Sequence, residues 1–279
     1  MPTVGGLDKA FYWADLWDCE AVQIYLTLSR TWKVNKLNDK EILNFKNGWR
    51  NSGVKEVVSH IPYLVNLASD KEEIRKKSID RLIAEIERAE ILEVKYIVLH
   101  PGSYGKATKE EGIKKIIDGL QLCLGKFKNI RSKILLETMA GQGTSIGSSF
   151  SDLKFIINNI SCFQLDVCLD TSHIFAAGYD IRDEKSYKKT LKEFDTVIGI
   201  DKIKVIHFND SKTELGSKID RHEDVGKGKI GMDAFSFFVN DERFREIPKI
   251  LETPNLELEN NAKDMIKALN FLITKDGKK

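Results

Sequence analysis

The chain has 279 residues, of which 42% are hydrophobic and 31% are charged, a composition typical of a globular protein with a sizeable core. Its formal net charge of +2 excludes a protein that holds nucleic acid by charge alone. No apolar run reaches the roughly 18 residues of a membrane span, and the first residues do not resemble a signal peptide. The four cysteines form no C-x-x-C pair, which fits a reducing, cytoplasmic compartment.

Short apolar runs alternate with longer amphipathic segments along the chain. The apolar runs are continuous, which is typical of parallel strands buried on both faces. The segments between them have apolar residues spaced by three and four, which predicts helices, and Asn38 or Asp39 caps the first of these helices. The predicted strands span 21–28, 54–60, 95–100, 133–137, 165–170, 203–208 and 248–252, and the predicted helices span 38–51, 71–93, 108–129, 150–160, 184–198, 231–241 and 257–274.

Seven strands, each followed by a helix, have two main architectural solutions: an open doubly wound sheet and a (β/α)₈ barrel. The chain contains no G-x-G-x-x-G and no phosphate-binding G-x-x-x-x-G-K-[ST], so neither nucleotide motif favours the open sheet. It also contains no internal linker or low-complexity block. We therefore expect a single α/β domain over residues 1–279, with 274–279 as a flexible tail.

Six of the seven predicted strands carry an acid or a histidine at or next to their carboxyl end. Active sites of parallel barrels form at that face, from residues on several strands. If the strands close into a ring, these side chains converge. They are His60, His100, Glu137, Asp170, His207 and Glu252.

The two remaining histidines, His173 and His222, are expected in polar loops after strand ends, and each lies near an aspartate, Asp170 or Asp220. A single histidine is more often a hydrogen-bonded core residue, but all five histidines of the chain fall in this pattern. Histidine and carboxylate together suit zinc, manganese or iron. Zinc takes about four ligands, so nine candidate ligands indicate two or three ions. Clustered divalent ions facing water are typical of phosphoryl-oxygen chemistry.

Longer motifs carry a resemblance to a known family. The segments are HIPYLVNLAS, LHPGS, ETMAGQGTSIG, LDTSHIFAAGYDI, IHFNDSKTELGSKIDRHEDVGKGKIG and ILETP. In these segments the chain resembles the endonuclease IV family of apurinic/apyrimidinic endonucleases, over about residues 5–275. The resemblance implies a (β/α)₈ TIM barrel with three zinc ions, with manganese as an option. It also implies an enzyme that cuts duplex DNA 5′ to an abasic site in base excision repair and leaves a 3′-hydroxyl.

The resemblance also implies how the nine ligands are shared among the ions. One ion would be held by His60, His100 and Glu137. A second would be held by Glu137 as a bridge, together with Asp170, His207 and Glu252. The third would be held by His173, Asp220 and His222. The bridging position makes Glu137 the residue most directly tied to catalysis.

Two early loops resemble the DNA-reading loops of the family. The segment SRTWKV contains Arg30 and Trp32. The segment HIPYL contains Tyr63 and Leu64, at the place where an aromatic and an apolar side chain enter the duplex at the lesion. Local packing is the alternative for Tyr63 and Leu64, and a solvated surface charge is the alternative for Arg30.

Residues around the third group of ligands are expected to shape it without binding a metal. Asn209 and Asp210 follow His207 and are expected to orient ligands or the loop. Gly226 and Gly228 are expected to allow a tight turn that positions the later ligands.

The start of the chain departs from the family. The family has an additional strand and a Gly-His-Val-Ser-like segment before the position of Gly5 and Gly6, whereas this chain begins Met1-Pro2-Thr3-Val4. We therefore expect the first barrel strand to be largely missing, which accounts for seven predicted strands. None of the nine candidate ligands is lost with it.

The sequence thus predicts a zinc-dependent endonuclease that acts on abasic DNA, with 3′-end trimming as a further activity. We expect it to be monomeric and cytoplasmic, or nuclear in a eukaryote. One alternative is a sugar isomerase or epimerase on a related barrel, but such enzymes need one or two ions and have no use for a third ligand group. The other is a nucleic-acid-binding protein with structural metals, which the position of six ligands at the open end of a barrel disfavours.

Overall fold

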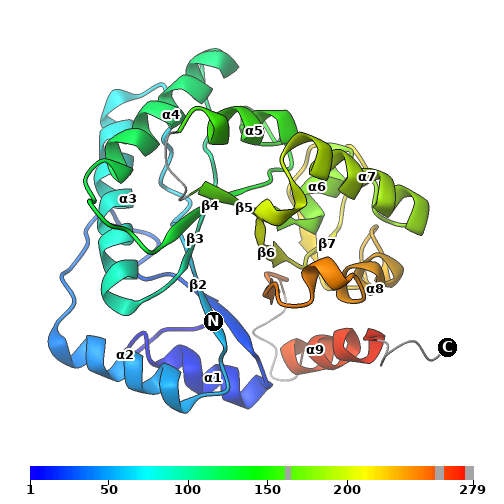
Figure 1. The fold of residues 1–279 in the computed structure, drawn as a ribbon, viewed down its shortest axis with the longest axis horizontal. Coiled ribbons are helices and arrows are strands. Elements are labelled where there is room, and N and C mark those ends of the chain that lie inside the picture. The colour runs from blue at the N-terminus through cyan, green and yellow to red at the C-terminus, as the bar shows by residue number, and fades with distance from the viewer. Residues whose placement is uncertain (161–164, 255–260, 274–279) are drawn as a thin grey trace.

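The computed structural model describes residues 1–160, 165–254 and 261–273. Its main sheet has seven parallel strands that follow one another in chain order around a ring, and helices surround them (Figure 1). A short antiparallel pair, β7 and β8, is inserted after the sixth strand of the ring. The strands are β1 (Ala21–Ile24), β2 (Glu56–His60), β3 (Tyr96–Leu99), β4 (Lys133–Glu137), β5 (Leu165–Asp170), β6 (Ile203–His207), β7 (Asp210–Ser211), β8 (His222–Glu223) and β9 (Lys249–Ile250).

All seven predicted strands are present, and the predicted TIM barrel architecture is confirmed. The strand order runs from β1 to β9, and no hydrogen-bonded ladder joins these two edges in the part of the chain that is described. A side-chain bond crosses between the edges instead, because Gln23 Nε2 donates to Glu252 Oε1 at 2.5 Å. The amino group of Met1 donates to the backbone oxygen of Gln23 at 2.7 Å, so the first residue lies against the β1 edge.

Seven predicted helices are also present, with slightly shorter bounds. Asn38 caps the first of them, accepting a bond from Glu41 N at 2.9 Å while the Glu41 carboxylate bonds back to Asn38 N. Part of the last predicted helix, residues 257–260 and 274, lies outside the described residues, and so does the tail expected at 274–279. The helices are α2 (Asp39–Asn51), α3 (Glu72–Leu92), α4 (Lys109–Leu124), α5 (Phe150–Asn158), α7 (Glu184–Val197), α8 (Met232–Val239) and α9 (Asn261–Leu272).

In the described residues, two short α-helices and two 3₁₀ helices lie outside the predicted helices: α1 (Lys9–Trp17), α6 (Thr171–Ala177), η1 (Ile200–Lys202) and η2 (Glu242–Phe244). α6 starts directly after β5, where the Asp170 side chain accepts a bond from His173 N at 2.7 Å and caps the helix. The expectation that His173 lies in a loop is therefore wrong, and so is the same expectation for His222, which is the first residue of β8. Seven residues are too few for a 3.6-residue period to stand out, and six of them are buried, so no polar face marks the helix.

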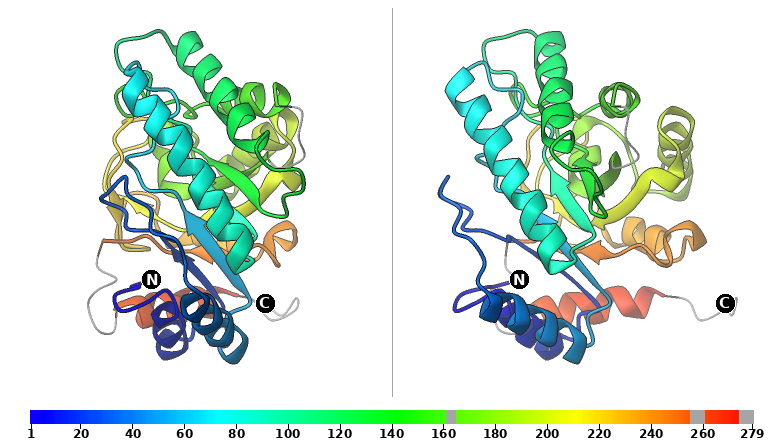
Figure 2. Two further views of the ribbon diagram at one scale, coloured as in Figure 1. Left: turned by 90° about the vertical axis from the view of Figure 1, so that its left-hand side faces the viewer. Right: turned by 60° about the vertical axis from the view of Figure 1, so that its left-hand side comes forward.

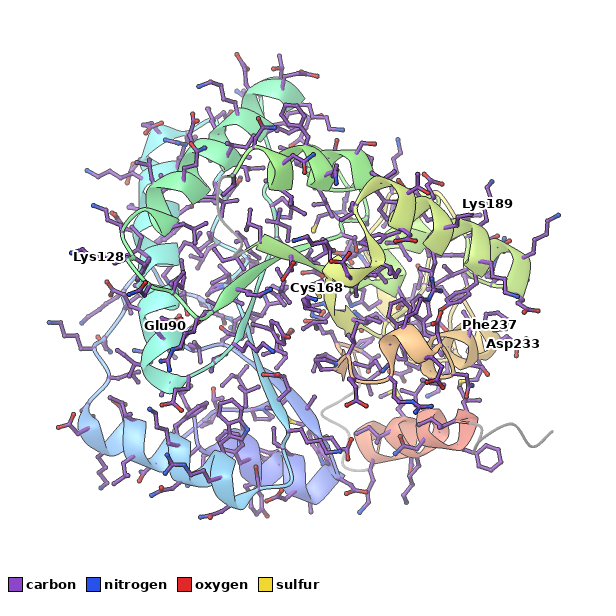
Figure 3. The ribbon with its side chains drawn as sticks, in the orientation of Figure 1. Glu90, Lys128, Cys168, Lys189, Asp233 and Phe237 are labelled. Atoms are coloured by element: carbon purple, nitrogen blue, oxygen red, sulfur yellow. The ribbon has the colours of Figure 1, made fainter. Side chains whose placement is uncertain are left out.

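The core has two layers separated by the ring of strands. The outer layer lies between the strands and the helices. The helices surround the sheet in both views of Figure 2. The inner layer fills the ring and includes Cys168. Figure 3 shows Cys168 near the centre of the molecule, whereas Lys128 and Lys189 lie at its periphery. The inner residues are Val58, Tyr96, Val98, Leu135, Cys168, Val205 and Ile250. In the described residues, no helix is both long and apolar enough to cross a membrane.

Candidate metal centre

The alternation of side chains along the strands builds a polar layer directly above the apolar inner layer. Successive side chains of a strand point to opposite faces, so the residue two positions after an inner residue points inward again. Six of the predicted metal ligands come two positions after a residue of the inner layer on the same strand, so they also point into the barrel, directly above that layer. The pairs are Val58 and His60, Val98 and His100, Leu135 and Glu137, Cys168 and Asp170, Val205 and His207, and Ile250 and Glu252.

Glu137, the last residue of β4, lies at the centre of this polar layer and is fully buried. Its Oε2 atom is 3.2 Å from Nε2 of His60 and 3.0 Å from Nε2 of His100. Its Oε1 atom is 3.2 Å from Nδ1 of His173 and 3.1 Å from Nδ1 of His207. One carboxylate thus contacts four imidazoles, two at each oxygen, which is a geometry suited to a bridge between two ions.

A second group forms around His207, at the carboxyl ends of neighbouring strands. His207 is in register with Asp170 across the β5–β6 ladder. Its Nδ1 atom is 3.0 Å from Oε2 of Glu252 and 3.7 Å from Oδ2 of Asp170. Atoms of Glu137, Asp170, His207 and Glu252 all lie within 4.8 Å of one another, close enough to share one ion.

The third group brings together α6 and the excursion that follows β6. Nε2 of His173 is 3.1 Å from Oδ2 of Asp220, and Nε2 of His222 is 3.3 Å from Oδ1 of the same carboxylate. Neither nitrogen has a regular hydrogen-bond partner among the described residues, although both are buried. Asp170 also reaches this group, because its carboxylate lies within 4.8 Å of ligand atoms of His173 and His222. We call the nine residues of the three groups the strand-end cluster.

Backbone oxygens fix the orientation of three histidines in the strand-end cluster. Nδ1 lies 2.7 Å from Ile61 O in His60 and 2.8 Å from Thr138 O in His173, and 3.3 Å from Glu252 O in His222. A backbone oxygen only accepts, so Nδ1 carries a hydrogen, and Nε2 is the nitrogen that faces the carboxylates and is available to bind an ion. Metal-binding histidines are oriented in this way.

Asn209 and Asp210 hold the surroundings of the cluster, as the sequence predicts for them. The Asn209 amide donates to Asp170 Oδ2 at 2.6 Å and accepts from Glu252 N at 2.8 Å. The buried Asp210 carboxylate accepts bonds from five backbone N–H groups, four of them between residues 226 and 231. Gly226 has φ +79°, and a Cβ at Gly228 would lie 2.4 Å from Asp210 Oδ1, so both positions require glycine.

Gln23 completes the polar layer and was missed by the sequence reasoning. Its Oε1 atom accepts from Nε2 of His207 at 2.8 Å, and its Nε2 atom donates to Glu252. Ala21, two residues earlier on β1, packs against the inner layer, as the alternation requires. A polar residue inside the apolar run AVQIYLTL was the available signal. Glutamine is neither an acid nor a histidine, so the pattern of strand-end ligands does not include it.

Burial and mutual pairing shift the pKa values in the strand-end cluster. Burial alone would raise the pKa of Glu137, but the surrounding histidines, His100 and His207 first, hold it well below its usual value. Burial also opposes charge on the third group. There His173 and His222 hold the pKa of Asp220 below its usual range, and Asp220 raises the pKa of His222 to about 9. The Glu137 and Asp220 carboxylates therefore stay charged near neutral pH, and negative charge at these positions favours a nearby cation.

The residues predicted to contact DNA lie on two loops at the carboxyl ends of β1 and β2. Arg30 is exposed and Tyr63 is 68% exposed, whereas Trp32 and Leu64 are half-buried against the outer core. A missed neighbour is Tyr25, whose ring lies edge-on to the His60 imidazole with centroids 5.8 Å apart. The loops thus border the strand-end cluster, and the DNA contacts stay a prediction.

The donor set fits divalent metal ions. Five imidazoles and four carboxylates, in three groups of close side chains, suit zinc or manganese better than calcium or magnesium, which prefer oxygen alone. The two buried nitrogens of His173 and His222 without regular partners point the same way. The chain therefore carries candidate metal-binding clusters at the carboxyl ends of its barrel strands.

Comparisons with known proteins agree in fold and in the kind of relative. A family model described as "Xylose isomerase-like TIM barrel" matches residues 11–275. A protein named "Probable endonuclease 4" from Geotalea daltonii is 42% identical, covering 95% of this chain and 93% of its own length. An "Apurinic-apyrimidinic endonuclease" of Caenorhabditis elegans is 42% identical over 91% of this chain and 65% of its own length. The crystal structure of endonuclease IV from Thermus thermophilus has a TM-score of 0.82 at 32% identity, covering 95% of each chain.

Proposed function

We propose that this chain, which belongs to the endonuclease IV family of DNA-cleaving hydrolases, cuts the phosphodiester bond 5′ to an abasic site in duplex DNA and leaves a 3′-hydroxyl. The observation that carries the proposal is the buried Glu137 carboxylate with two imidazoles at each oxygen. A phosphodiester is an anion that repels nucleophiles, so its hydrolysis needs concentrated positive charge. The strand-end cluster is suited to gather that charge at the open end of the barrel.

Three zinc ions per chain are the loading that the residues fit best, with manganese as an alternative. One ion would take His60, His100 and Glu137. The second would share Glu137 and also take Asp170, His207 and Glu252, and the third would take His173, Asp220 and His222. Ions of this kind, when bound, would supply a water nucleophile near neutral pH and neutralise the phosphate and the leaving oxygen.

The protein's own contribution is to orient the ligands and to select the substrate. Gln23 and Asn209 hold ligand side chains by hydrogen bonds, so that the donor atoms face one another before any ion arrives. Tyr63, exposed at the rim, is placed to stack at a position where a base is missing. A duplex already lacking a base costs less to distort than an intact one, which favours abasic sites over undamaged DNA.

The decisive experiment is incision of an end-labelled duplex that contains one abasic analogue. We expect a single cut 5′ to the analogue, a product that a DNA polymerase extends, loss of cutting with a chelator, and recovery with zinc. Metal analysis of the purified protein should give close to three equivalents of zinc per chain. Full activity with one equivalent of any metal would contradict the three-ion arrangement.

The rival sugar isomerase or epimerase function has its own measurement, because the family description includes xylose isomerase-like barrels. The same preparation is assayed for interconversion of ketose epimers and of aldose and ketose sugars. Turnover of sugars without incision of abasic DNA would overturn the proposal.

We also propose that the site trims blocked 3′ ends, which a duplex nicked with a 3′-phosphate would test.

A further inference from the structure

A second buried group of charged residues lies on α3, outside the strand-end cluster. Arg81 is 2% exposed and Glu85 is fully buried, one turn apart on the helix. Arg81 Nε donates to Glu85 Oε1 at 2.9 Å, and the hydroxyl of Thr27 donates to the same carboxylate oxygen. A buried ion pair is costly unless its remaining hydrogen bonds are satisfied. The remaining hydrogen-bond partners of Arg81 therefore indicate which part of the chain the ion pair holds.

The other donors of Arg81 all go to the segment between β1 and α2. Nη1 donates to the backbone oxygen of Thr31 at 2.6 Å, and Nη2 donates to that of Leu28 at 3.0 Å. Nη2 also contacts the hydroxyl of Thr27. The guanidinium thus spans the backbone on both sides of Arg30, which is itself exposed.

Arg88, two turns further along α3, holds the two ends of the same segment. Its Nε donates to the backbone oxygen of Leu26 at 2.9 Å, and its Nη1 donates to that of Asn35 at 2.7 Å. Together the two arginines bond four backbone oxygens over ten residues, 26–35, a stretch that contains no helix or strand. This segment runs beside α3 between β1 and α2 (Figure 2).

We propose that Arg81, Glu85 and Arg88 form a loop clamp that fixes residues 26–35 before DNA binds, so that Arg30 and Trp32 are presented to the duplex in a preformed arrangement. Backbone oxygens in a loop otherwise bond to water and leave the loop free to move. A loop already ordered in the free protein does not lose that freedom on binding, so its contacts contribute more fully to affinity. The clamp deepens the proposed function and rests on it for the identity of the ligand.

The alternative is that these residues only stabilise the barrel, and the experiment must separate the two roles. Replacing Arg81 alone would leave Glu85 buried without its counterion and destabilise the fold. The main variant is therefore Arg81→Met with Glu85→Leu, which removes both charges at similar volume. Arg88→Met is the second variant, since it releases Leu26 and Asn35 and leaves the buried pair intact.

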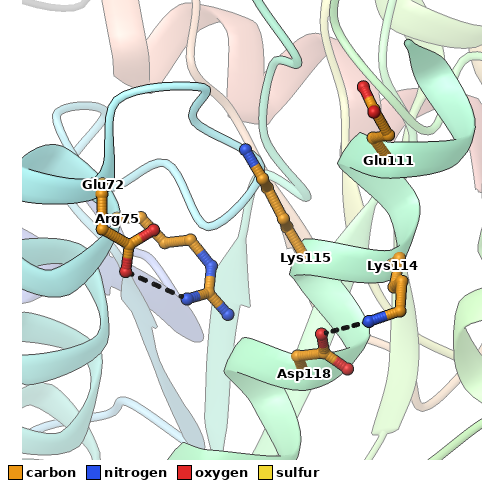
Figure 4. Close-up of a pocket in the computed structure, with 6 residues that line it drawn as sticks. All are labelled: Glu72, Arg75, Glu111, Lys114, Lys115 and Asp118. Carbon is orange, nitrogen blue, oxygen red and sulfur yellow. Dashed lines mark hydrogen bonds and ion pairs between the residues drawn. The ribbon is translucent and has the colours of Figure 1, made fainter. Parts of the chain in front are cut away.

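The matched control is Arg75→Met on the same helix. Arg75 lies in a surface cleft between α3 and α4 and pairs with Glu72 at 3.5 Å (Figure 4). The other lining residues of that cleft, Glu111, Lys114, Lys115 and Asp118, come from α4 and not from the loop. The control thus loses an arginine from α3 without touching residues 26–35.

The first measurement is limited digestion with trypsin, which needs neither metal nor DNA. The loop contains Arg30 and Lys33, both exposed, and Lys36 follows it directly. We expect nicking at these positions to be about tenfold faster in both clamp variants than in the wild type and the control, because each variant loses two hydrogen bonds to backbone oxygens of the loop. Equal nicking rates in clamp variants, control and wild type would overturn the clamp.

The second measurement is steady-state incision of the abasic duplex. We expect the KM of the clamp variants to rise about tenfold while kcat changes less than about twofold, because the contacts position DNA and do not take part in the chemistry. Faster nicking with an unchanged KM would overturn the role in DNA binding. A wild-type protein that does not incise abasic DNA would instead refute the proposed function, and the DNA role of the clamp with it, whereas digestion would still decide whether the loop is held.

Discussion

The strand-end cluster and the loop clamp are both buried and charged, but their charges are balanced in opposite ways. In the loop clamp, two guanidiniums that are always charged face one carboxylate and a series of backbone oxygens. In the strand-end cluster, four carboxylates face five imidazoles, and no arginine or lysine takes part in its ion pairs among the described residues.

The difference shows that the balance of charges within a buried group indicates whether the group binds ions or holds the chain in place. Imidazoles bind metals in their neutral form, so the four carboxylates of the strand-end cluster are left to be neutralised by cations. In the loop clamp the cationic surplus is spread over backbone oxygens, although Oε2 of Glu85 is buried without a hydrogen-bond partner among the described residues. An under-compensated cluster is suited to receive ions, and a self-compensated one is suited to hold the chain.

The largest expected effect comes from Glu137→Gln, which removes one charge from the centre of the strand-end cluster. Residues that support ligands cost roughly 10–100-fold when mutated, so a shared ligand should cost roughly a thousandfold or more in kcat. Binding of abasic DNA should persist, because phosphate contacts and the loops are untouched. Glu56→Gln, at the opposite end of the barrel in β2, is the control. Cleavage within a few-fold of wild type would mean that Glu137 does not bridge ions.

Asp210→Asn should have the next largest effect, because the Asp210 carboxylate holds the backbone next to the ligands. The change tests whether the strand-end cluster depends on that backbone. Asn keeps one acceptor oxygen and turns an NH₂ toward N–H groups that the carboxylate now satisfies. We expect roughly a hundredfold loss of kcat and a lower melting temperature. The control is Asp183→Asn, which alters a carboxylate that accepts from Ser186 N at the start of α7. Equal effects of the two changes would leave Asp210 with a general structural role.

Tyr63→Ala should weaken binding to abasic duplex by about 30-fold and binding to undamaged duplex much less, since a stacked aromatic contributes about 1–3 kcal/mol. Competition binding with both duplexes measures the ratio. Tyr12→Ala on α1 removes a side chain of similar exposure, 64% against 68% for Tyr63, and serves as the control. If the Tyr63 variant loses the same affinity for the abasic and the undamaged duplex, the side chain only packs locally.

Gln23→Met should have the smallest effect, about a tenfold loss of metal affinity, because it removes the hydrogen bonds to His207 and Glu252 and leaves every ligand in place. Chelator titration of the loaded protein measures this directly. Gln121→Met, on the outer helix α4, is the control. An unchanged affinity would show that the polar layer needs only its acids and histidines.

The strand-end cluster was largely predictable because its geometry follows from local rules. Six strands carry an acid or a histidine after an apolar run, and a parallel barrel brings those ends together, so these positions converge without knowledge of any loop. His173 was placed in the right region but in the wrong element, because α6 is too short and too buried to show a period.

The loop clamp was not predictable, because its contacts join residues about 50–60 positions apart in sequence. Arg81, Glu85 and Arg88 repeat every three or four residues on α3, and the sequence alone suggests an ordinary charged face beside the apolar stripe of Leu82 and Ile86. Only the path of the loop, which no periodicity describes, covers that face. For Asp210 the sequence predicts a loop-shaping role, but it does not predict the backbone partners of its carboxylate, which lie up to 21 residues later.

The apolar inner layer has an electrical consequence for the residues above it. Seven closely packed side chains, from Val58 to Ile250, form a floor of low polarisability beneath the strand-end cluster. The field of a charge held on that floor is weakly screened from below and spreads toward the open mouth of the barrel. A polyanion approaching the mouth would therefore feel bound cations more strongly than the modest net charge of the chain suggests.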